Sequence, residues 1–178
     1  RAKDIYPNYE SVVYGNRNYT WFETYNRCTK FASALTKQGI SLGSTVSIIA
    51  ANTPELLEAH YSIPMVGAVI NAINTRLDPK TISYILNHSD AKVLIADRQF
   101  HEVIAKALKD VKNKITIIDI EDKDIDTSKF KNIGELEYES FLNTGDLDYK
   151  WKKPKDEWQA ISLGYTSGTT GNPKGVVC

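Results

Sequence analysis

Short apolar runs alternate with amphipathic stretches along most of this chain, and this alternation restricts its possible folds more than any other feature. Four apolar runs have the length of buried strands, at residues 46–50, 69–73, 92–96 and 115–118. Between them, apolar residues recur at helical spacing, as in residues 56–63 and 100–108. Buried strands separated by helices pair mostly in parallel, because each crossover returns over a face of the sheet. We therefore predict an α/β fold with a mostly parallel sheet flanked by helices.

The first forty residues carry clear start and stop signals. Residues 11–20 predict a hairpin that turns at Gly15. Thr20 and Glu23 have the spacing of a capping box, so a helix is expected to begin there, and Gly39 is expected to end it. Cys28 lies on the apolar stripe of this helix, which favours a packing role over nucleophilic catalysis.

The segment at residues 121–158 is rich in charge and less periodic than the rest. We expect a short helix near residues 135–142 and a loop at residues 150–155. The acidic residues 121–124 lack the glycine and the distal glutamate of an EF-hand calcium loop, so a solvated loop is the better interpretation.

The most informative segment chemically is the run YTSGTTGNPKGVV at residues 165–177. Residues 166–175 hold four hydroxyl side chains, three glycines and one lysine. Glycine allows the backbone to approach a ligand closely, and successive N–H groups in such turns form an anion-binding concavity. Hydroxyl donors and a lysine ammonium also suit phosphate. Because the run follows an apolar strand, where α/β sheets commonly bind ligands, we interpret it as a phosphate-binding loop.

Other functional classes find little support in the sequence. The loop is not a Walker A motif, and the chain has no GxGxxG. With 22 basic and 22 acidic side chains, no net charge favours nucleic acid, and no stretch is apolar enough to span a membrane. The three histidines lack ligand spacing, and His88 is expected to cap a helix end. Two distant cysteines are most simply explained by a reducing, cytoplasmic setting.

The loop resembles the phosphate-loop signature of the adenylate-forming, or AMP-binding, superfamily, which includes acyl-CoA synthetases, peptide-synthetase adenylation domains and firefly-type luciferases. The match runs unbroken from Leu163 to Lys174. Residues 74–77 and 85–92 look most like acyl-CoA ligases for short or medium-chain acids, a group that includes methylthiopropionate–CoA ligases. Thr75 stands where a common form of the family has proline, which points to a subgroup. The resemblance implies that residues 1–178 are the N-terminal portion of the large domain, ending just after the phosphate loop.

Such enzymes are acid–thiol ligases. The resemblance implies that a small carboxylic acid reacts with ATP to give an acyl-adenylate and pyrophosphate, and that the acyl group then passes to the thiol of coenzyme A. By similarity, Thr166 would help to coordinate Mg²⁺, and Lys174 would be catalytic by offsetting the charge that grows on pyrophosphate. Tyr165 would end the strand and set the direction of the loop. The residues implied to hold the β- and γ-phosphates are Ser167, Gly168, Thr169, Thr170 and Gly171.

In this family the adenine, ribose and adenylation-lysine segments follow the loop, so we expect residues 1–178 alone to be inactive. The resemblance leaves open a homodimer of the intact enzyme. Two other functions also remain open: an adenylation domain that loads a carrier protein, and a non-catalytic nucleotide- or phosphate-binding module. The ligase-like residues 74–97 argue against the first, and a gene that ended at Cys178 would favour the second.

Overall fold

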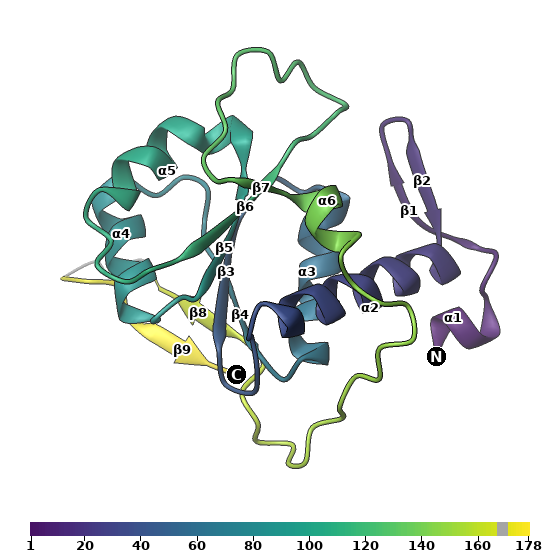
Figure 1. Cartoon of the computed structure of the whole chain (residues 1–178). Helices are drawn as coiled ribbons and strands as arrows, with labels where there is room; N and C mark the ends of the chain where they lie inside the picture. Colours follow the sequence, from purple (N-terminus) through teal and green to yellow (C-terminus); the bar gives the residue numbers. More distant parts are fainter. Residues whose placement is uncertain (167–170) are drawn as a thin grey trace.

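The chain forms a twisted parallel sheet with helices on both faces (Figure 1). The protein is represented by a computed structural model that describes residues 1–166 and 171–178. In spatial order, the strands of the sheet are β4 (Val69–Ala72), β3 (Thr45–Ile49), β5 (Val93–Asp97), β6 (Thr116–Ile120) and β7 (Leu136–Glu137). Every neighbouring pair is parallel. The predicted α/β fold with a mostly parallel sheet is therefore confirmed.

The helices divide between the two faces of the sheet (Figure 1). One face is covered by α2 (Trp21–Lys37), α3 (Pro54–Met65) and α6 (Tyr138–Leu142). The other is covered by α4 (Pro79–His88) and α5 (His101–Leu108), with the short 3₁₀ helix η1 (Arg98–Phe100) leading into α5. The chain begins with one helical turn, α1 (Ala2–Ile5), which the sequence analysis did not predict.

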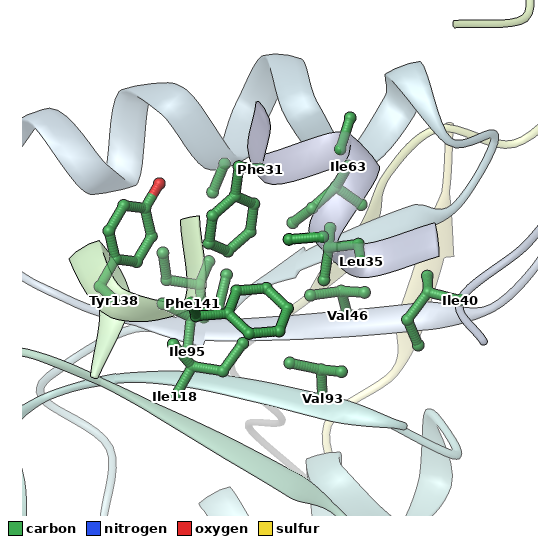
Figure 2. Packing of buried hydrophobic residues seen from close by; sticks show 14 of the residues in the cluster. Phe31, Leu35, Ile40, Val46, Ile63, Val93, Ile95, Ile118, Tyr138 and Phe141 are labelled. Carbon is green, nitrogen blue, oxygen red and sulfur yellow. The ribbon is translucent and has the colours of Figure 1, made fainter. Parts of the chain in front are cut away.

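Each central strand contributes side chains to both faces, because successive strand residues point in opposite directions. Val93 and Ile95 belong to the core under α2 and α3, whereas Leu94 and Ala96 belong to the core under α4 and α5. This two-sided burial explains why the strands read as continuous apolar runs. Figure 2 shows the core under α2 and α3. There the ring of Phe31 stacks on that of Tyr138 with centroids 4.6 Å apart.

The N-terminal hairpin and the first long helix follow their sequence signals. Strands β1 (Glu10–Tyr14) and β2 (Arg17–Thr20) pair in antiparallel fashion. The Thr20 hydroxyl accepts from the Glu23 N–H at 3.2 Å, and the Glu23 carboxylate accepts from the Thr20 N–H at 2.8 Å. Gly39, with φ 84°, follows α2, where a left-handed residue lets the chain reverse. Cys28 is buried in the core, as predicted.

The predicted helix at residues 135–142 is only half right. Leu136 and Glu137 pair with β6 as the edge strand β7, and the helix α6 begins at Tyr138. The Glu137 carboxylate accepts hydrogen bonds from the N–H groups of Glu139 and Ser140 at 3.0 and 2.8 Å, so it caps the helix. Sequence spacing could not reveal this boundary, because the β7 pairing depends on a distant strand. The loop predicted at residues 150–155 contains no helix or strand.

Candidate functional site: the loop at the carboxyl edge of the sheet

The phosphate-loop segment connects two short strands beside the edge strand β4. Strands β8 (Leu163–Tyr165) and β9 (Gly175–Val177) form an antiparallel hairpin, with Tyr165 opposite Gly175. Ser162, just before β8, forms a parallel bridge with Ile70 of β4, and the Ile70 N–H donates to the Ile161 carbonyl at 3.0 Å. Because β8 runs parallel to β4, its carboxyl end lies at the same edge of the sheet, where open α/β sheets bind ligands.

The two ends of the loop meet at its base. The Thr166 N–H donates to the Lys174 carbonyl at 3.1 Å, which extends the hairpin by one pair. The residue predicted to bind Mg²⁺ and the lysine predicted to be catalytic are thereby brought together, and both are exposed. Tyr165 ends β8, as predicted.

The structure describes only part of the predicted phosphate-binding set. Ser167, Gly168, Thr169 and Thr170 lie outside the described residues. Gly171, the last residue of the predicted set between Thr166 and Lys174, lines a cavity at the base of the loop.

This cavity has a volume of about 270 Å³ and is built by three segments. The lining comes from the end of β4 with the residues that follow it, from α4 with the turn before it, and from both sides of the loop: Asn71, Ala72, Ile73, Asn74, Leu77, Thr81, Ile85, Tyr165, Thr166, Gly171 and Pro173. A larger hollow of about 700 Å³ lies between β1 and α3 and shares no lining residue with the loop. We therefore assign the candidate site to the smaller cavity.

One lining residue, Asn71, is polar and fully buried, although sequence analysis did not single it out. Its Nδ2 donates to Ser47 Oγ at 3.0 Å, while its Oδ1 has no hydrogen-bond partner among the described residues. A buried acceptor without a donor is costly unless water or a ligand satisfies it. The available signal was the single polar side chain in the otherwise apolar run at residues 69–73.

The side chains near the loop determine how a magnesium ion could fit. Within residues 1–166 and 171–178, no three His, Cys, Asp or Glu side chains are placed to hold a metal ion together. Mg²⁺ prefers six oxygen ligands and is commonly held by one or two protein oxygens together with substrate phosphates. The side chain of Thr166, at the base of the loop, carries one neutral hydroxyl oxygen. One hydroxyl oxygen of this kind is compatible with a metal that arrives together with a nucleotide.

The base of the loop is also tied to α4. The ring Nδ1 of His88, the last residue of α4, lies 2.8 Å from the Tyr165 hydroxyl. His88 was expected to cap a helix end. It does lie at the end of α4, but it is not the residue that caps the helix. The residue that caps the helix is Ser89, whose backbone N–H donates to the Ile85 carbonyl at 2.9 Å, whereas the ring of His88 contacts Tyr165 of β8.

Comparison with known proteins gives consistent results. The family model described as AMP-binding enzyme matches residues 1–178. The chain is 46% identical over 187 residues to the acetate–CoA ligase CCL3 of Humulus lupulus. It is 44% identical over 187 residues to the acetate/butyrate–CoA ligase AAE7, peroxisomal, of Arabidopsis thaliana. Each alignment covers 99% of this chain and 33% of the relative, so the chain spans about a third of the length of these relatives.

Solved structures show the same fold. The anthranilate CoA ligase AuaEII, solved in complex with anthranoyl-AMP, superposes with a TM-score of 0.88 at 24% identity, covering 99% of this chain and 32% of that chain. A benzoate CoA ligase from Burkholderia xenovorans LB400 superposes with a TM-score of 0.81 at 20% identity, covering 98% of this chain and 32% of that chain. In the part of the chain that the structure describes, no helix has both the length and the apolar character needed to cross a membrane.

Proposed function

Because this chain belongs to the AMP-binding enzyme family, we propose that it is the N-terminal portion of an ATP-dependent acyl-CoA ligase. The observation that carries the proposal is the base of the loop, where Thr166 and Lys174 meet beside the cavity at the carboxyl edge of the sheet. The names of the relatives support the acyl-CoA ligase class over a carrier-protein-loading domain.

The proposed reaction has two steps. A carboxylate oxygen of the acid bonds to the α-phosphorus of ATP while the bond to the bridging oxygen of pyrophosphate breaks, which leaves an acyl-adenylate. The thiol of coenzyme A then displaces AMP to form the thioester. Both the attacking carboxylate and the phosphate chain are anionic, so positioning and charge stabilisation are the main contributions that the protein can make.

Each end of the loop has a distinct role in this proposal. Lys174 would bind the β- and γ-phosphates as a compact positive charge and offset the charge that develops on pyrophosphate. Thr166 would donate one oxygen to the Mg²⁺ that accompanies ATP, and that ion would supply further charge neutralisation. Backbone N–H groups from Ser167 to Gly171 would bind the phosphate oxygens.

The acid is proposed to be short. Two relatives are named for acetate or butyrate, which makes short-chain acids the first substrates to test. A cytoplasmic setting and a homodimer of the intact enzyme remain predictions. Size-exclusion chromatography with light scattering tests the second, and imaging of a tagged protein tests the first.

ATP–pyrophosphate exchange by the full-length gene product tests the proposed function. We expect exchange that depends on Mg²⁺ and on acetate or butyrate, followed by thioester formation when coenzyme A is added. Exchange with transfer to a carrier protein but not to coenzyme A would favour the carrier-loading alternative. A folded protein that binds ATP without exchange with any acid would favour the non-catalytic binding module.

Substitution of the loop lysine tests the residue assignment within the same assay. We expect Lys174→Ala to lower the exchange rate by about 100- to 1,000-fold, the range for loss of one group that stabilises transition-state charge. The fold should be unchanged, because Lys174 is exposed. Lys155→Ala is the matched control, since Lys155 is an exposed lysine in the loop that precedes β8. Equal exchange rates in the two variants would contradict the role of Lys174.

A further inference from the structure

His88 makes a contact that neither helix formation nor core packing requires. Its ring Nδ1 lies 2.8 Å from the hydroxyl of Tyr165, a residue 77 positions later in the chain. The two rings are also in edge contact, with centroids 5.7 Å apart and planes at 81°. His88 is exposed, so it contributes little buried apolar area to the fold.

The ring of His88 is held in its orientation from its own helix. Tyr84, one turn earlier on α4, stacks on it with centroids 5.3 Å apart and planes at 22°. Residues four apart lie on the same helix face, so this stack aims the imidazole toward β8. Burial raises the pKa of Tyr165, so its phenol stays protonated near neutral pH and its O–H can donate to an unprotonated Nδ1.

The end of β8 has little backbone attachment to the parallel sheet. Among the described residues, one bridge joins this hairpin to β4, between Ile70 and Ser162, and it lies three positions before Tyr165. At Tyr165, the ties to the rest of the fold are made by its side chain, which packs against the core under α4 and bonds His88. Because Thr166 follows directly, the orientation of Tyr165 sets where the loop leaves the sheet.

We propose that His88 is a positioning residue for the phosphate loop, acting through its hydrogen bond to the Tyr165 hydroxyl. This inference rests on the proposed function. His88 itself is not assigned any contact with ATP. Its effect is to hold one side of the loop base, while the Thr166–Lys174 hydrogen bond holds the two sides together. A loop base that is already held in place loses less conformational entropy when ATP binds, so removal of the His88–Tyr165 hydrogen bond should weaken ATP binding.

The test compares four variants of the full-length gene product. His88→Ala removes the imidazole, Tyr165→Phe removes only the hydroxyl, and the double variant removes both. His88→Asn returns an acceptor oxygen near the position of Nδ1. His60→Ala is the control, because the His60 ring bonds the Leu56 carbonyl of its own helix, on the opposite face of the sheet.

His88→Ala and Tyr165→Phe are each expected to raise the KM for ATP in pyrophosphate exchange by about 3- to 10-fold, the range that one hydrogen bond supports. The KM for the acid should stay constant. The double variant should be no worse than either single variant, and His88→Asn should regain part of the loss. A purely structural role would instead lower the melting temperature and the active fraction without changing the KM for ATP.

Calorimetric titration of the same proteins with Mg²⁺ and ATP separates this inference from the proposed function. If the wild type binds ATP but does not catalyse exchange, the ligase assignment fails, and the 3- to 10-fold change is sought in the ATP Kd instead. Wild-type affinity in His88→Ala and Tyr165→Phe, or losses that add in the double variant, would overturn the role of His88. A wild type that binds no ATP would overturn both.

Discussion

Removal of the Glu58 carboxylate should be among the most destabilising single changes in this protein. Glu58 lies on α3 with its side chain 1% exposed. Its carboxylate accepts hydrogen bonds from the Nε of Arg27 on α2 and, at 3.2 Å, from the Nη2 of the same side chain. It also accepts one from the buried Tyr138 hydroxyl of α6 at 2.9 Å. Three helices over one face of the sheet therefore meet at a single carboxylate.

The magnitude of the effect follows from these contacts. Glu58→Ala leaves a buried Tyr138 hydroxyl without its acceptor, which costs about 1–3 kcal/mol. It also leaves Arg27, 15% exposed, with Glu139 as its one remaining counter-ion among the described residues. Breaking a buried ion pair costs about 3–5 kcal/mol in general, and the remaining Glu139 should keep the total near the lower end, about 3–4 kcal/mol.

Equilibrium unfolding in urea measures this cost, with the m value as a check that the transition is unchanged. Glu58→Gln should cost about 2 kcal/mol, because the amide keeps an acceptor for Tyr138 but loses the charge. Glu139→Ala is the matched comparison. Its carboxylate bonds the same guanidinium but is 37% exposed, so solvent screening should reduce its cost to about 1 kcal/mol. Equal costs for Glu58→Ala and Glu139→Ala would refute the argument that burial sets the energy of this cluster.

Two further predictions concern caps and ionisation. The Asp78 carboxylate caps α4 by accepting from the N–H groups of Lys80 and Thr81 at 3.0 and 3.1 Å, so Asp78→Ala should lower the free energy of unfolding by about 1 kcal/mol in urea titrations. An effect below about 0.3 kcal/mol would show that the cap is dispensable. The hydrogen bond to Asp122 raises the pKa of Tyr14 from 10.0 to about 12, so the unfolded chain releases this proton at lower pH than the folded one. The stability contributed by Tyr14 should therefore be complete below pH 10 and lost as pH approaches 12, and Tyr14→Phe should show a shallower decline of unfolding free energy over that interval.

Sequence spacing predicted the alternation of strands and helices because hydrogen-bond geometry and side-chain periodicity are local. The capping box at Thr20 and the chain reversal at Gly39 are encoded within a few residues and are confirmed. The edge strand β7 was missed because Leu136 and Glu137 become a strand only by pairing with β6. A two-residue strand carries no periodicity of its own that a sequence pattern could reveal.

The candidate site, like the fold, could be predicted from the sequence only in part. The glycines, hydroxyls and lysine of residues 165–177 indicate phosphate chemistry from their types and order alone. The cavity could not be predicted, because Asn71 and Thr81 reach it from different elements. Asn71 in particular looks like an ordinary strand residue, and only the tertiary structure shows that its buried Oδ1 has no hydrogen-bond partner among the described residues.

The sequence by itself determined the fold class and the main alternation of strands and helices, and it predicts a loop suited to phosphate, because each of these depends on neighbours along the chain. The tertiary structure decided which distant groups meet. Arg27 finds Glu139 across 112 positions, and His88 finds Tyr165 across 77. These partners are selected by packing of helices on a common sheet, and the free energy of each contact depends on burial that exists only after folding.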